Sequence, residues 1–338
     1  MRTLTIADAE SLARQALEAS GTAPGAARST ARALVAAEID GQAGHGLSRV
    51  PSYAEQLRSG KVDGRAVPSC RRVGLGAVRI NAAGGLAYPA LDLAVEALPG
   101  LARECGVAIA TIHRSHHIGQ AGYTAERLAQ QSCLGLICSN TPRAMPFPGG
   151  LRPMMGTNPL AFAAPLPDRP PLVIDLALSQ VARSRIVAAQ KASEAIPLEW
   201  ATDRAGRPTQ DPAAALAGAL APAGGVKGAS LALIVEILCG ALAGGHYGWE
   251  ASAFLDDRGS PPAVGQVLLA FEPQALSAGE FPRRISELLA AVAAENGVRL
   301  PGDRRLARRA RARSHGLEID ARLHASLASL AGAAEAAR

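Results

Sequence analysis

The sequence predicts an α/β protein in which helices cover a sheet and both chain ends form a helical lobe. From about residue 73 onward, short β-like runs alternate with helical segments, whereas the two ends show mainly helical patterns. Such alternation is typical of a sheet packed against helices. The 338 residues are 48% hydrophobic, which is enough to fill a core. We expect residues 1–72 plus 279–338 to form the helical lobe and residues 73–278 the sheet-containing lobe.

The first part of the chain predicts three helices. Thr5 begins a capping pattern ahead of apolar residues that recur at helical spacing over 9–17. Pro24 suits the first turn of a second helix, which runs to about Asp40. Ser48 is expected to cap a third helix. The stretch GHGLSR (44–49) therefore begins in a loop after a helix.

The middle of the chain predicts the sheet. Residues 119–131 read as a helix between strands, and Pro99 is expected to kink or split a helix over 88–104. The segment 227–245 is apolar on most faces, which predicts a buried central helix. The expected strands are AVRI (77–80), VAIATI (107–112), LGLICSN (134–140), LVIDLA (172–177) and GQVLLAFEP (265–273).

Composition and charge argue against several classes of protein. The net charge of +6 is concentrated in residues 303–313, and without a nucleic-acid motif it suits an anionic small molecule better than a nucleic-acid partner. Five cysteines without CxxC spacing argue against a zinc site or a disulfide framework. No signal peptide and no membrane-spanning run is recognised, so we expect no membrane partner and a cytoplasmic location.

The common motifs of nucleotide-binding and hydrolytic enzymes are missing from the sequence. We find no GxGxxG fingerprint after a strand, no P-loop, no HExxH and no GxSxG. Polar residues gather instead in glycine-rich loops, where backbone N–H groups can meet anionic ligands. These loops are GHGLSR (44–49), SHHIGQAG (115–122), the segment 139–162, GGVKG (224–228) and PGDRR (301–305).

Together these loops resemble the malate/L-lactate dehydrogenase family, whose members reduce 2-oxo acids or cyclic imino acids with NADH or NADPH. The resemblance covers nearly the whole chain and implies a non-Rossmann, mixed-sheet NAD(P)-binding fold and a homodimer. The sequence is most similar to the sulfolactate dehydrogenase and the piperideine-2-carboxylate and pyrroline-2-carboxylate reductase branches. The matching segments are DGQAGHGLSRVPSY (40–53), SHHIGQAGY (115–123), GTNPLAFAAP (156–165), VIDLALSQVARSRI (173–186), KGASLALIVEIL (227–238) and RLPGDRR (299–305).

The resemblance makes His45 the proton donor and acceptor at the reacting oxygen or nitrogen, and it makes Arg49 the carboxylate-binding residue. The chemistry agrees, because imidazole titrates near neutral pH and a guanidinium grips a carboxylate with two hydrogen bonds. The alternatives are a surface histidine in a turn and an arginine in a surface ion pair.

The resemblance also implies the cofactor-binding residues. Lys227 would be a phosphate partner, with a water-facing lysine as the alternative. Adjacent arginines near residue 304 would suit the extra phosphate of NADPH. The alternatives are NADH as the cofactor and an arginine run that forms a solvated helix face. The full set is His117, Ile118, Gly119, Gln120, Ala121, Asp175, Leu176, Ala177, Lys227, Pro301, Gly302, Asp303, Arg304 and Arg305.

The remaining substrate contacts are Asn140, Thr141 and Arg185. The imino-acid reductase branch is similar in having a Ser-His pair assisted by an aspartate, but this chain has Gly44 before His45 and Arg185 where that aspartate aligns. A cation there suits a second anionic group on the substrate, such as a carboxylate or sulfonate. Three neighbouring histidines lack a carboxylate at ligand spacing, so no metal is expected.

We therefore predict an enzyme that interconverts a small 2-hydroxy acid of the malate, lactate or sulfolactate type and its 2-oxo acid with NADPH or NADH. The alternative is an NADPH-dependent piperideine-2-carboxylate or pyrroline-2-carboxylate reductase. A catalytically silent protein that binds nucleic acid through residues 304–313 is a rival from another class.

Overall fold

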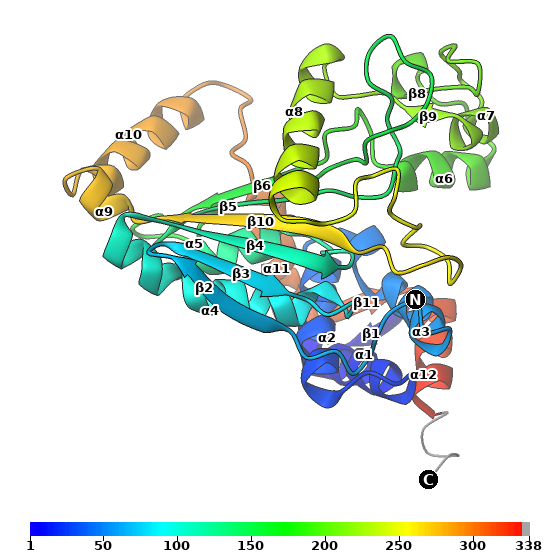
Figure 1. Ribbon diagram of the computed structural model, residues 1–338, viewed down its shortest axis with the longest axis horizontal. Helices are drawn as coiled ribbons and strands as arrows, with labels where there is room; N and C mark the ends of the chain where they lie inside the picture. Colours follow the sequence, from blue (N-terminus) through cyan, green and yellow to red (C-terminus); the bar gives the residue numbers. More distant parts are fainter. Residues whose placement is uncertain (333–338) are drawn as a thin grey trace.

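The protein is described by a computed structural model, in which residues 1–332 are placed well enough to describe. Seven strands among these residues form one mixed sheet in the order β2-β3-β4-β10-β5-β6-β7, with β3 and β4 parallel. The predicted α/β class is confirmed (Figure 1). The strands are β2 (Ser69–Gly74), β3 (Ala77–Asn81), β4 (Val107–Ser115), β5 (Leu134–Ser139), β6 (Leu160–Ala164), β7 (Leu172–Leu176) and β10 (Val264–Phe271).

All five expected strand segments lie in this sheet, whereas β2 and β6 were not predicted. β2 is exposed along its whole length, so it lacks the alternation of apolar and polar residues that marks a half-buried strand. β6 follows a loop rich in proline and glycine, which hid its start.

Helices α4 (Ala87–Cys105) and α5 (Ala121–Ala129) pack on one face of the sheet. α4 is one continuous helix that is not split at Pro99, and the alternative expectation of a kink there stays a prediction. Pro99 lies inside the helix and cannot donate to the carbonyl oxygen of Val95, but Nε2 of Gln131 donates to that oxygen at 3.2 Å. A side-chain donor thus replaces the missing backbone bond.

The helical lobe is formed by residues 1–58 together with residues 303–332, which lie beside one another toward the lower right of Figure 1. β1 (Arg2–Leu4) pairs with β11 (Leu317–Ile319), a two-stranded sheet that the sequence did not reveal because three residues show no period. Ser48 does not cap the third helix, since its hydroxyl donates to the carbonyl of Ala43. The lobe helices are α1 (Ile6–Ala19), α2 (Pro24–Ile39), α3 (Val50–Arg58), α11 (Asp303–His315) and α12 (Ala321–Gly332).

Helix α10 (Phe281–Ala293) differs from its expected place. It follows the short α9 (Pro273–Leu276) at the far end of the sheet from the other lobe helices, and it has no buried residue (Figure 1). The boundaries 1–72, 73–278 and 279–338 therefore stay predictions, and α10 stands apart from the helical lobe to which they assign it.

A second core lies over the other face of the sheet and includes α8 (Val226–Glu236), which continues as a π-helical turn (Ile237–Leu242). Contrary to the sequence prediction, this segment is not buried on all faces. Ile234 and Ile237 are 50% and 53% exposed. The remaining elements here are α6 (Arg183–Ala192), α7 (Pro212–Ala217), β8 (Ala201–Thr202) and β9 (Ala219–Leu220). No helix within residues 1–332 has the length and apolarity to cross a membrane.

Candidate active site

His45 and Arg49 lie on two successive 3-10 turns, Ala43–His45 and Leu47–Arg49, between α2 and α3. Gly46 fits here because a Cβ on it would lie 2.2 Å from a carboxylate oxygen of Glu38, which accepts from the next backbone N–H. Nε of Arg49 donates to the carbonyl of Gly44 at 2.5 Å. The turn thus holds the imidazole and the guanidinium in one compact unit.

The histidine of this turn meets the loop after β4. Nδ1 of His45 lies 3.1 Å from Nε2 of His117, and the two rings stack with centroids 5.2 Å apart. His117 was predicted to bind cofactor, but both of its ring nitrogens are used inside the protein, because Nδ1 lies 2.7 Å from Oη of Tyr53. The cofactor contact of His117 stays a prediction.

A second histidine and an aromatic ring close the site from behind. His116 bonds to Oε1 of Gln56 at 2.9 Å, and Nε2 of Gln56 donates to the carbonyl of Phe254 at 2.9 Å. The Phe254 ring packs against His116 and His117 at centroid distances of 5.3 and 5.2 Å. Nζ of Lys61 holds the same loop through the carbonyls of residues 253 and 256.

Burial keeps these imidazoles neutral. Burial, followed by the charge of Arg49, lowers the pKa of His45 to about 4. Burial lowers the pKa of His116 to about 3 and that of His117 well below its usual range. A substrate carboxylate paired with Arg49 would remove part of this effect and raise the pKa of His45. Within residues 1–332 no cluster of three His, Cys, Asp or Glu side chains is placed to hold a metal.

Arg49 is half-buried, and its terminal amino groups bond to no other residue in the part of the chain that the structure describes. No carboxylate of residues 1–332 forms an ion pair with it. A guanidinium held only through Nε keeps two parallel N–H groups for an incoming carboxylate.

The predicted cofactor loops converge beside this turn. The backbone N–H of Gly122, at the start of α5, donates to Asp175 at 2.8 Å. Nε2 of Gln120 donates to Asp40 at 2.9 Å, and the guanidinium of Arg305 lies 3.9 Å from the same carboxylate. The loop after β4, the end of β7 and the first turn of α11 therefore lie beside the C-terminal end of α2.

The surroundings of Arg305 show whether the residues present suit an anionic cofactor. Its side chain is only 10% exposed, yet its Nε and Nη2 atoms are buried without a hydrogen-bond partner, as is Oε1 of Gln120. Gly302 has φ +99°, and a Cβ there would lie 3.1 Å from Nη2 of Arg305. Buried polar atoms rarely stay unpaired, and phosphate or hydroxyl oxygens would satisfy these. The residues present therefore fit a phosphorylated, hydroxylated cofactor.

The other predicted cofactor residues surround these loops. Ile118 and Ala121 are buried, whereas Leu176, Ala177 and Lys227 are exposed. The turn before Lys227 is tied to the loop after β7, since the N–H of residue 223 donates to the carbonyl of residue 178 at 2.9 Å. At the start of α11, Pro301 and Arg304 are exposed, and Asp303 lies 3.5 Å from Arg169.

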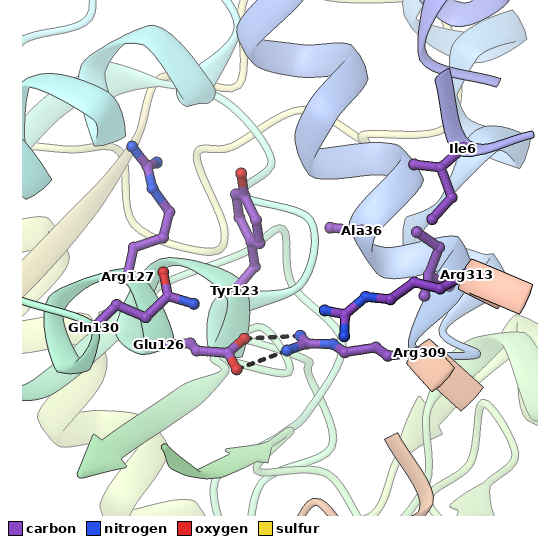
Figure 2. A pocket seen from close by; sticks show the side chains of 9 residues that line it. Ile6, Ala36, Tyr123, Glu126, Arg127, Gln130, Arg309 and Arg313 are labelled. Atoms are coloured by element: carbon purple, nitrogen blue, oxygen red, sulfur yellow. Dashed lines mark hydrogen bonds and ion pairs between the residues drawn. The ribbon is translucent and has the colours of Figure 1, made fainter. Parts of the chain in front are cut away.

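Sequence reasoning missed Arg309, one helical turn after Arg305. Its guanidinium bonds to Asp40 at 2.6 and 2.7 Å and grips Glu126 with two bonds of 2.7 Å. Figure 2 shows the ion pair of Arg309 with Glu126 beside a cavity of about 340 Å³ between α2, α5 and α11. None of the residues that line this cavity belongs to the turn that carries His45 and Arg49.

Asn140 has no side-chain atom left for the predicted substrate contact. Its Nδ2 donates to Glu236 at 3.0 Å and to the carbonyl of His246 at 2.6 Å, and its Oδ1 accepts from the backbone of Gly265 at 3.0 Å. The buried amide thus ties β5 to the end of α8. Thr141 is half-buried with its hydroxyl 3.4 Å from that of Thr157, so it remains a candidate for that contact.

Arg185 lies on α6 with its guanidinium 5.0 Å from the centre of the Trp200 ring. The preceding residue, Ser184, is 3.7 Å from the position that a Cβ on Gly44 would take. The first turn of α6 therefore packs against the His45 turn, which brings the exposed Arg185 to the same region.

A family model described as malate/L-lactate dehydrogenase matches residues 4–328. The chain belongs to this family. A (2R)-3-sulfolactate dehydrogenase (NADP(+)) from Chromohalobacter salexigens is 49% identical over 94% of this chain and 95% of its own length. The predicted family resemblance is confirmed.

Solved structures of malate/L-lactate dehydrogenase relatives agree with the fold. The crystal structure of Δ1-piperideine-2-carboxylate reductase from Pseudomonas syringae pvar. tomato matches with a TM-score of 0.93 and 36% identity, covering 98% of this chain and 100% of the other. Sulfolactate dehydrogenase from Methanocaldococcus jannaschii matches with a TM-score of 0.89 and 28% identity, covering 97% and 96%. The protein is an oxidoreductase of the dehydrogenase or reductase kind, as predicted.

Proposed function

We propose that this protein interconverts a small 2-hydroxy acid and its 2-oxo acid with NADP(H), and that sulfolactate and sulfopyruvate are the preferred pair. One observation carries this proposal. His45 lies on the same turn as Arg49, whose terminal amino groups are unpaired within residues 1–332, and this turn lies beside the predicted cofactor-binding segments. The 49% identity to an NADP(+)-dependent sulfolactate dehydrogenase supports both the substrate class and the cofactor.

The residues divide the reaction between them. Arg305, Lys227 and the loop 117–121 would hold the dinucleotide, which supplies the hydride when it is bound. Arg49 binds the substrate carboxylate with two hydrogen bonds and so fixes the carbonyl carbon. His45 gives a proton to the carbonyl oxygen in reduction and takes it back in oxidation. The Phe254 ring shields the imidazoles from water.

Arg185 is proposed to bind a second anionic group of the substrate. Its α6 turn lies against the His45 turn, and stacking on Trp200 restrains the planar guanidinium without using its N–H groups. A sulfonate or distal carboxylate would meet a cation there. Arg304 and Arg305 favour NADPH over NADH, because guanidinium groups bind an additional phosphate well.

The second candidate is reduction of piperideine-2-carboxylate or pyrroline-2-carboxylate. The TM-score of 0.93 to a piperideine-2-carboxylate reductase supports it. Arg185, where the resemblance to that branch implies an aspartate, favours the oxo-acid reaction.

The test is the initial rate of NADPH oxidation with sulfopyruvate, oxaloacetate, pyruvate and the two cyclic imines, each at matched concentration. We expect the highest kcat/KM with sulfopyruvate and a lower value with pyruvate, which lacks the second anionic group. A cyclic imine as the best substrate would reverse the order of the two candidates. Absence of turnover with all five would contradict both.

We further propose a homodimer in which the apolar face of α8 is covered by a second copy. A stripe of large apolar residues this exposed is unusual on a monomer. Its members, 43–57% exposed, are Leu231, Leu233, Ile234, Ile237 and Leu242.

The mass in solution by light scattering is expected to be twice 34.6 kDa. Ile234→Arg should shift the protein to the monomer, because it places a charge in the apolar contact. Leu75→Arg, at an 82% exposed turn away from α8, is the matched control and should remain dimeric. A monomeric wild type would contradict the proposal.

The five free thiols agree with a reducing compartment, and a cytoplasmic location stays our proposal.

A further inference from the structure

A chain of hydrogen-bonding groups runs from His45 into the protein interior. His45 Nδ1 lies 3.1 Å from His117 Nε2, His117 Nδ1 lies 2.7 Å from Tyr53 Oη, and Tyr53 Oη lies 3.4 Å from Tyr88 Oη. Tyr53 is fully buried, and Tyr88 and His117 are buried as well. Two hydroxyls and two imidazoles therefore share their protons with one another.

The chemistry of these groups sets the direction of the chain. A phenol is a stronger hydrogen-bond donor than a neutral imidazole N–H, and an imidazole lone pair is a stronger acceptor than a phenol oxygen. The short bond is therefore donated by Tyr53 to Nδ1 of His117. A neutral imidazole has one N–H, so the proton of His117 is on Nε2 and is donated to Nδ1 of His45.

The surroundings of Tyr53 and Tyr88 favour this direction of the hydrogen bonds. Tyr88 has Tyr53 as its hydrogen-bond partner within residues 1–332, so its hydroxyl donates to Tyr53 and leaves the Tyr53 proton for His117. Burial, partly opposed by the charge of Arg49, raises the pKa of Tyr53 and keeps the hydroxyl protonated between turnovers. Gly119, where a Cβ would lie 2.5 Å from Tyr88 Oη, leaves room for that hydroxyl.

We propose that Tyr53 is a positioning residue that, through His117, keeps the proton of neutral His45 on Nε2 and replaces that proton when it leaves. The inference rests on the proposed reduction and deepens it. It also accounts for the missing aspartate of the Ser-His-Asp arrangement, since His117 and Tyr53 now orient the imidazole. Neither residue needs a charge at rest to do so.

Each group that gives up a proton, except Tyr53, receives one from its neighbour. A bound nicotinamide would supply hydride to the carbonyl carbon, and the carbonyl oxygen would then take the Nε2 proton of His45. The Nε2 proton of His117 moves to Nδ1 of His45, and the hydroxyl proton of Tyr53 moves to Nδ1 of His117. Tyr53 is left as a phenolate, which accepts a hydrogen bond from Tyr88 and faces the positive charge of Arg49. After the product leaves, solvent returns one proton to Nε2 of His45. The proton on Nδ1 of His45 then moves back to Nε2 of His117, and the proton on Nδ1 of His117 moves back to the oxygen of Tyr53.

The direct test is the tautomer of each histidine by 15N NMR of the full-length protein near pH 7, which needs no turnover. Seven histidines make assignment by single His→Gln variants practicable. The wild type should show neutral His45 and neutral His117, each protonated on Nε2. Tyr53→Phe should add the Nδ1-protonated form of His117. A wild-type His45 protonated on Nδ1, or unchanged spectra in Tyr53→Phe, would overturn the proposal.

Kinetics supply the second test. Tyr53→Phe should lower kcat by roughly 100-fold with little change in KM for NADPH, because the fold and the cofactor loops keep their contacts. Tyr88→Phe should have a smaller effect in the same direction. Tyr123→Phe removes a hydroxyl that takes no part in this series of hydrogen bonds. It is the control and should match the wild type. Full kcat in a folded Tyr53→Phe would overturn the proposal. A wild type inactive on every 2-oxo acid would overturn the proposed function, and the NMR result would still decide this inference.

Discussion

Replacing His45 by alanine is expected to lower kcat for the preferred 2-oxo acid by about 10²- to 10⁴-fold, the usual contribution of a positioned acid or base. The reason is geometric as well as chemical. His45 lies on the same turn as Arg49, and its Nδ1 is held by His117, which leaves Nε2 for the substrate. The variant lacks the imidazole that would protonate the carbonyl oxygen.

The measurement is single-turnover oxidation of bound NADPH, together with a fluorescence titration of NADPH binding. Cofactor affinity should change little, because the loops that would hold NADPH are anchored by Asp175 and Arg305 rather than by His45. His315→Ala, at an exposed position on α11, is the matched control and should keep wild-type turnover. His45→Ala with turnover close to wild type would remove His45 from the mechanism.

Arg49→Lys is expected to lower kcat/KM by about 10- to 100-fold, mostly through KM, although the positive charge is retained. An ammonium cannot form the two parallel hydrogen bonds of a guanidinium, and a hydrogen bond to a charged group contributes about 1.5–3 kcal/mol. The variant also loses the bond from Nε of Arg49 to the carbonyl of Gly44, which orients the side chain.

The kinetics of Arg49→Lys should be compared for pyruvate and for pyruvamide, in which an amide replaces the carboxylate. The wild type should favour pyruvate strongly, and the variant should lose most of that preference. If the variant kept the wild-type KM and the wild-type preference, the carboxylate would be bound elsewhere.

The fold was predictable where a residue pattern reports burial. The strand runs and the early helices were found because their apolar residues alternate or recur with helical spacing. The prediction that α8 is buried was wrong for a physical reason. A helix that is apolar on all faces shows the same residue pattern whether its outer face is covered by its own chain or by another copy. Ile234 and Ile237 are exposed in the single chain, and only the proposed second copy would cover them.

The candidate site was predictable where a residue acts alone and less so where it acts through a neighbour. The roles of His45, Arg49 and Arg305 stay predictions from the resemblance, and the structure brings the segments that carry these residues together. Tyr53 was missed, although it follows Arg49 by four residues and so shares a helix face with it.

The hydrogen bond between Tyr53 and His117 joins residues 64 positions apart, which no local pattern encodes. Asn140 shows the opposite limit, because a polar residue after a strand looks like a ligand contact until its buried partners are known.

The most direct measurement is a crystal structure of the protein with NADPH and oxamate, an unreactive analogue of a 2-oxo acid. We expect Nε2 of His45 within hydrogen-bond distance of the oxamate amide oxygen, which stands for the reacting carbonyl. The guanidinium of Arg49 should grip the carboxylate with two bonds, and a cofactor phosphate or hydroxyl should meet the unpaired nitrogens of Arg305. Oxamate bound away from His45 and Arg49, with neither side chain in contact with it, would contradict the account.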